Sequence, residues 1–169
     1  GLSASDVLTV ELEEIANELE ERLNQKSLSL IEVPENIAKI IQILRRQDFD
    51  YNDIADLVSG SPILMGELIH VGNSSIYQRA NKITQLNLLL PRLGVKVISS
   101  LLYMHSLELG LAENSRYSPI AVSIVRHSRV VATISQFLAK RYYTDSDEAF
   151  CAGLLHDIGR LALLNQFDY

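Results

Sequence analysis

The chain has 169 residues, of which 47% are hydrophobic, and it contains a single cysteine, Cys151. This length is sufficient for one domain with a substantial core, and a lone cysteine excludes an intramolecular disulfide and fits a reducing compartment. The N-terminus is acidic and no run reaches the roughly 18 apolar residues of a membrane helix, so we expect a soluble, cytoplasmic protein without a membrane partner.

Residues 1–24 carry seven acidic and one basic side chain, which accounts for the net charge of −6. The remaining body is neutral, which argues against non-specific binding of nucleic acid.

An amphipathic helix with an acidic outer face is predicted at the N-terminus. Its apolar side chains recur at spacings of three and four residues, at Leu8, Leu12, Ile15, Leu19 and Leu23. The repeat is too short for a coiled coil, so we interpret residues 1–26 as a connector that docks on the body or joins it to a partner domain. A homodimer would form through the same helix.

The body is predicted to be all-α, because no segment alternates polar and apolar residues as a half-buried strand does. Ser61-Pro62 and Ser118-Pro119 each combine a capping serine with a proline in the first helical turn. Pro91 is expected to interrupt or kink a helical run. The expected helices cover residues 35–46, 53–59, 62–71, 83–90, 95–109, 118–141 and 147–164.

The last two predicted helices each carry one polar break in an apolar stripe. His127 interrupts the first stripe and Asp157 the second. The apolar residues of the first stripe are Ile120, Ile124, Val131, Ile134 and Leu138. Those of the second are Phe150, Leu154, Leu161 and Leu164. A buried carboxylate needs a partner, and in an antiparallel pair His127 would come within about one helical turn of His156 and Asp157. These three side chains form an incomplete site for Zn, Fe or Mn, which normally takes four or more ligands.

Several stretches resemble, in their order and spacing, the HDOD domain, a relative of HD and HD-GYP phosphohydrolases. They are VPENIAKIIQIL (33–44), SPILMGELIHVGNSSIY (61–77), ITQLNLLLPRLGVKVI (83–98), RHS (126–128) and EAFCAGLLHDIGRLAL (148–163). The resemblance covers residues 28–164 and implies a compact multi-helix, HD-like domain of bacterial signal transduction. It also implies that the domain lacks catalysis and has receiver, kinase or cyclase-type modules as partners.

The HD enzymes that the chain resembles need a His on one helix, an adjacent His-Asp pair on the next, and a further Asp later. His127, His156 and Asp157 match the first three, whereas Asp168 follows too soon to be the fourth. Arg160 stands where HD-GYP phosphodiesterases carry a Lys. We therefore expect residues 27–169 to be an HDOD-like domain, truncated at its C-terminal end, with a vestigial metal cluster.

Three roles remain open for this cluster. We favour a structural one, in which Asp157 pairs with His127, His156 or Arg160 and fixes two helices in register, with no catalysis and no resident cofactor. In the second, the cluster binds a divalent metal weakly without turnover. In the third, a metal-bound water attacks a phosphoester of a nucleotide or cyclic dinucleotide. The arginines that could then contact the phosphate are Arg126, Arg129 and Arg160.

Residues 53–69 have the pattern of a helix-turn-helix motif. However, the helix that would be its recognition helix has no Arg, Lys, Asn or Gln to contact base edges. Nucleic acid is therefore not an expected partner. We expect regulation through protein–protein contacts, either in the groove between the 62–71 and 95–109 helices or through the N-terminal helix. His70 and His105 are expected to be structural, and Tyr77 to anchor its loop onto the core.

Overall fold

The computed structural model of the chain describes residues 14, 16–18, 20–21, 33–77, 82–112, 118–142 and 145–166. The chain divides into two units, Gly1–Leu30 and Ile31–Tyr169. In the first unit the described residues are helical and exposed. The apolar stripe predicted for the connector helix lies outside the described residues.

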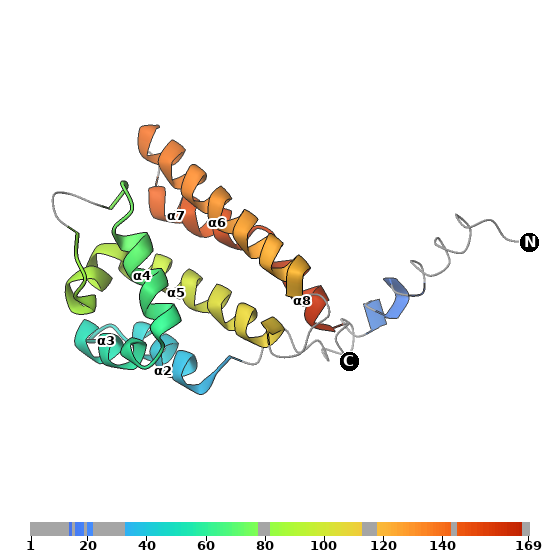
Figure 1. The fold of residues 1–169 in the computed structure, drawn as a ribbon, viewed down its shortest axis with the longest axis horizontal. Helices are drawn as coiled ribbons and strands as arrows, with labels where there is room; N and C mark the ends of the chain where they lie inside the picture. Colours follow the sequence, from blue (N-terminus) through green and yellow to red (C-terminus); the bar gives the residue numbers. More distant parts are fainter. Residues whose placement is uncertain are drawn as a thin grey trace, which may run out of the picture. The chain divides into compact units, whose positions relative to one another are not determined.

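The second unit is all-helical over its described residues (Figure 1). Its helices are α2 (Glu35–Leu44), α3 (Tyr51–Ser59), α4 (Pro62–Gly72), α5 (Leu86–Ala112), α6 (Ser118–Arg141), α7 (Ser146–Leu155) and α8 (Ile158–Gln166). Two aspartates cap helices from the preceding residue: the Asp50 carboxylate accepts a hydrogen bond from the Asn52 amide, and Asp145 accepts from the amides of Asp147 and Glu148. Local capping chemistry thus sets several of these starts.

The long helix α5 forms the centre of the core and contacts every other helix of this unit. Figure 1 shows it lying between α2 and α3 on one side and the α6–α7 pair on the other. Its length and apolar composition would suit a membrane span. However, half of its most apolar stretch of 18 residues is buried inside the domain, as in the core helix of a globular protein. Its buried apolar side chains are Leu86, Leu89, Leu90, Leu93, Val97, Ile98, Leu101, Leu102, Met104, Leu107 and Leu111.

A break divides α5 into two helical segments. It lies at Gly94, which has φ 76° and ψ 162°, whereas Pro91 stands within the first segment. The prediction that Pro91 interrupts the run therefore placed the break slightly early. A positive φ is readily adopted by glycine and costly for residues with a Cβ, so Gly94 is the residue that permits the change of direction.

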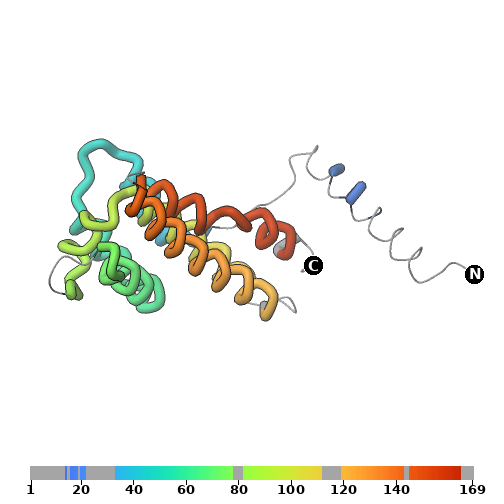
Figure 2. Tube along the Cα trace, turned by 90° about the horizontal axis from the view of Figure 1, so that it is seen from above, coloured from blue at the N-terminus to red at the C-terminus, as the bar shows by residue number. Residues whose placement is uncertain are grey.

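The rotation of α6 differs from the predicted one. Of the predicted inward stripe, Ile124 is buried, but Ile120, Ile134 and Leu138 are 47–53% exposed. The face turned inward consists mainly of small or polar residues, namely Ala121, Ile124, Val125, Ser128, Ala132, Gln136 and Ala139. The prediction assumed that the largest aliphatic side chains face the core. Small residues instead allow α6 to lie close beside α7 (Figure 2).

Helices α6 and α7 approach each other closely at Gly153. A Cβ at this position would lie 2.8 Å from the Ala132 Cα and 2.9 Å from its backbone nitrogen. We therefore expect Gly153→Ala to lower the free energy of unfolding by about 1–3 kcal/mol, because the two backbones must move apart. Urea denaturation followed by circular dichroism measures the change.

Gly66→Ala in α4 is the matched control, because a Cβ there would meet nothing within 4 Å. This substitution should leave stability unchanged or raise it by up to about 1 kcal/mol, since alanine is the better helix former. Equal stability of the two variants would contradict the close contact.

A hydrogen-bond network joins the loop after α4 to α6 and α7. The Tyr77 hydroxyl donates to Asp147 Oδ1 at 2.7 Å and accepts from Gln136 Nε2 at 2.5 Å. Lys140 Nζ donates to the Ile76 carbonyl at 2.8 Å. Burial and the neighbouring Asp147 carboxylate raise the pKa of Tyr77, so the phenol stays protonated and able to donate. Tyr77 therefore anchors its loop as predicted.

Tyr77→Phe should lower the free energy of unfolding by about 1–3 kcal/mol, because it leaves Asp147 and Gln136 without their hydroxyl partner in a partly buried site. Tyr103→Phe provides a control, since the half-buried Tyr103 hydroxyl makes no hydrogen bond among the described residues. Thermal unfolding of both variants measures the difference. A Tyr77→Phe protein as stable as Tyr103→Phe would show that the network does not hold the loop.

Candidate metal centre

His156 and Asp157 lie in a turn between α7 and α8, and not inside one continuous helix as the apolar pattern predicted. The Nδ1 atom of His156 lies 2.8 Å from the Gly153 carbonyl oxygen. Carbonyls at the end of a helix lack intrahelical donors, so a proton on Nδ1 satisfies this one. The Nε2 atom then keeps its lone pair for a proton or a metal.

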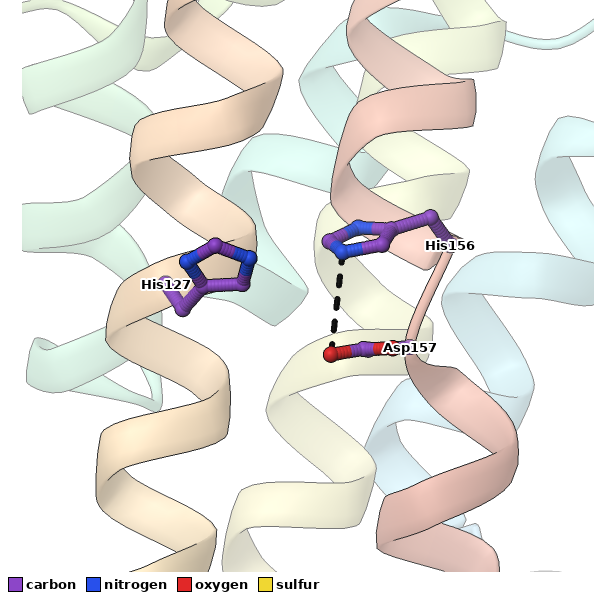
Figure 3. A group of neighbouring side chains, drawn as sticks. All are labelled: His127, His156 and Asp157. Atoms are coloured by element: carbon purple, nitrogen blue, oxygen red, sulfur yellow. Dashed lines mark ion pairs between the residues drawn. The ribbon is translucent and has the colours of Figure 1, made fainter.

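Figure 3 shows His127 of α6 facing the His156-Asp157 turn. The two imidazole rings meet edge to face with centroids 5.4 Å apart, and His156 Nε2 lies 3.6 Å from Asp157 Oδ2. One ligand atom from each of the three residues lies within 4.8 Å of the other two. His127 is exposed and the Asp157 side chain is 21% exposed, so the group is less buried than the predicted core-facing stripes require. We call these three residues the HD cluster.

The donor set of the HD cluster suits a transition metal, because Zn, Fe and Mn accept imidazole and carboxylate ligands. Bonds of about 2.0–2.2 Å place two ligands of one ion at most about 4.4 Å apart, so small side-chain rotations would close the site. Asp157 Oδ2 also accepts a 2.9 Å hydrogen bond from Arg160. Among the described residues no fourth His, Cys, Asp or Glu joins the group. An ion held here would have three protein ligands and would compete with Arg160.

The three arginines considered as phosphate contacts lie in different surroundings. Arg160 pairs with Asp157, and Arg129 pairs with Glu67 at 2.9 Å and with Glu108 at 2.8 Å. Arg126 is exposed and lines an open depression on α6 together with His70, Arg129, Val130, Thr133 and Ile134. Two of the three guanidinium groups are thus already paired with carboxylates.

A second polar cluster, which we call the buried carboxylate cluster, consists of Glu67 of α4 with His105 and Glu108 of α5. One ligand atom of each lies within 4.8 Å of the others, and His105 is only 3% exposed. Sequence reasoning assigned His105 a structural role and gave the two glutamates none. The available signal was the one-turn spacing of His105 and Glu108 inside an otherwise apolar helix.

Burial dominates the electrostatics of this cluster. It raises the pKa of Glu67 and raises the pKa of Glu108 to about 7, in each case against the opposing effect of Arg129. Burial and the Arg129 charge both lower the pKa of His105. His105 is therefore neutral at neutral pH, and an imidazole nitrogen is available as an acceptor.

Comparison with known proteins places this geometry in a family. The model of the HDOD domain matches residues 30–169. No curated protein matches the chain.

Two solved structures share the fold. A putative metal-dependent phosphohydrolase from Shewanella amazonensis SB2B is 22% identical, with a TM-score of 0.73 over 92% of this chain and 58% of its own. An HDOD domain protein with unknown function from Geobacter sulfurreducens is 24% identical, with a TM-score of 0.52 over 85% of this chain and 50% of its own. The chain thus spans 58% of the length of the first protein and half of the second.

Proposed function

The chain belongs to the HDOD domain family, whose members are related to HD phosphohydrolases, and we propose that it is a non-catalytic regulatory domain of bacterial signal transduction. In this proposal it works in the cytoplasm and transmits a signal through contacts with receiver, kinase or cyclase-type modules. Residues 1–26 act as the connector to such a module. The HD cluster then has a structural role at the junction of α6, α7 and α8.

The observation that carries the proposal is the pairing of Asp157 with Arg160 in a cluster of three ligands. A metal-bound water becomes a nucleophile when a firmly held cation lowers its pKa. A guanidinium group on the ligand carboxylate opposes a cation there, and no fourth protein ligand among the described residues offsets this effect. The same contacts suit a structural role, because His156 satisfies the end of α7 and Asp157 holds the first turn of α8.

Exposed apolar side chains on α6 support a role in protein contacts. Three of them follow each other at intervals of four residues and therefore lie along one face of the helix, at Val130, Ile134 and Leu138. They are 47–53% exposed, and Phe137 beside them is 59% exposed. Apolar residues gathered on one face mark sites of association more often than scattered ones do. We assign this α6 face to partner binding, next to the proposed groove at α4.

A metal-dependent phosphohydrolase is the second candidate. The convergence of His127, His156 and Asp157 and the name of the Shewanella protein favour it. Its substrate would be a nucleotide or a cyclic dinucleotide. With a metal bound, the cluster would supply an activated water, and Arg126 is the remaining unpaired candidate among the three arginines for contact with a phosphate.

The absence of catalysis is tested with the protein as purified and after addition of Mn²⁺ or Zn²⁺. We expect hydrolysis of bis(p-nitrophenyl) phosphate and of cyclic dinucleotides to be no faster with the wild type than with Asp157→Asn, because Asp157 is engaged by Arg160. Elemental analysis of the wild type and His127→Ala accompanies the assay. Metal-dependent turnover that both substitutions abolish would establish the phosphohydrolase instead.

The role in protein contacts is tested by complementation of a strain lacking the gene. We expect the double variant Ile134→Glu, Phe137→Glu to lose complementation, because charge on the α6 face opposes burial against a partner. The variant Asp157→Asn should keep it. Leu88→Glu is the matched control, since Leu88 is 56% exposed and belongs to α5 and not to α6. Full complementation by the α6 variant, or loss with Asp157→Asn, would contradict the proposal.

A further inference from the structure

The buried carboxylate cluster has two ligand atoms that face each other without a partner. Glu67 Oε2 and His105 Nδ1 are both buried and form no hydrogen bond among the described residues. They lie 4.0 Å apart, on side chains that are 10% and 4% exposed. Burying a polar atom without a partner costs about 1–3 kcal/mol, so two such atoms side by side call for an explanation.

The separation of these atoms suits one ion between them. It is too long for a hydrogen bond, whereas two metal–ligand bonds of about 2.0–2.2 Å span up to about 4.4 Å. Glu108 lies one turn beyond His105 on α5 and completes a set of three ligand atoms within 4.8 Å of one another. The free oxygen of Glu67 is the one that Arg129 does not bind, because Arg129 pairs with Oε1.

The charges also favour a cation. Glu67 and Glu108 share Arg129 as counter-ion, so ionisation of both carboxylates leaves an excess negative charge in a partly buried setting, and burial raises the pKa of each carboxyl. An uncompensated buried charge is strongly unfavourable, and a divalent ion with a neutral His105 as ligand compensates it. Arg129 is 43% exposed and lies at the edge of the cluster, so it can turn toward solvent when an ion enters.

A route from solvent reaches the cluster. A cavity of about 340 Å³ opens between α4 and α6, and its lining includes Glu67, His70 and Arg129. Glu67 thus contacts the cavity on one side and faces His105 on the other. A hydrated ion entering here meets the Glu67 carboxylate before it reaches His105.

We propose that Glu67, His105 and Glu108 form a binding site for a divalent transition metal, separate from the HD cluster. One imidazole and two carboxylates are ligands for Zn²⁺, Mn²⁺ or Fe²⁺, whereas Ca²⁺ and Mg²⁺ prefer oxygen alone. In the metal-free protein Arg129 pairs with both carboxylates. Because the ligands come from α4 and α5, metal binding joins these two helices and frees Arg129 of α6 from its two ion pairs.

The test is metal binding by the full chain after removal of metals with a chelator. Isothermal titration with Zn²⁺ and with Mn²⁺ is compared for the wild type, Glu67→Gln and Glu108→Gln, which keep the size of the side chains. We expect one equivalent whose affinity falls at least about tenfold in each variant. The HD-cluster variants His127→Ala and Asp157→Asn should retain that equivalent.

A spectroscopic measurement on the wild type makes the test independent of variant stability. Addition of Zn²⁺ should shift the ¹⁵N resonance of His105 Nδ1, and Co²⁺ in its place should give ligand-field absorption that Glu67→Gln removes. An unmoved His105 resonance at saturating metal would overturn the proposal, as would binding that only the HD-cluster variants abolish. In either case the space between Glu67 and His105 would hold a bridging water.

Discussion

The close contact between α6 and α7 determines where both polar clusters form. Gly153 places no side chain between the helices, so the backbone of Ala132 packs directly against it. This contact fixes the rotation of α6, with its small residues turned inward. His127 is thereby brought to the His156-Asp157 turn, and Arg129 to the partly buried Glu67 and Glu108. One helix contact therefore positions a ligand of the HD cluster and the counter-ion of the other cluster.

Sequence patterns predicted the helices well because the signals for their ends are local. The proline after Ser61 and the carboxylates of Asp50 and Asp145 act within a turn of the residues that encode them. The rotation of α6 and the break at His156 are not set by such local signals. Both depend on how closely a neighbouring helix approaches, and a periodicity of large aliphatic residues contains no information on that distance.

The HD cluster could be anticipated and the buried carboxylate cluster could not. His156 and Asp157 are adjacent, and a repeated family pattern links them to His127. Only the one-turn spacing of His105 and Glu108 gave a signal in the sequence, and Glu67 and Arg129 lie on two other helices, where each is compatible with an ordinary structural role. Their convergence arises only from the packing of α4, α5 and α6 around the core, so it becomes visible only in three dimensions.

The two clusters also differ in what their carboxylates require. Asp157 is accessible to water and its partner Arg160 is 61% exposed, so that ion pair contributes at most about 1 kcal/mol. The Glu67 side chain is only 10% exposed, so its negative charge needs a counter-ion. That counter-ion is Arg129, which also pairs with Glu108. In the metal-free protein, an arginine that pairs with both of these carboxylates does not contact a phosphate at the protein surface. These ion pairs thus withdraw one of the three candidate phosphate contacts from the HD cluster, which supports the proposed regulatory role.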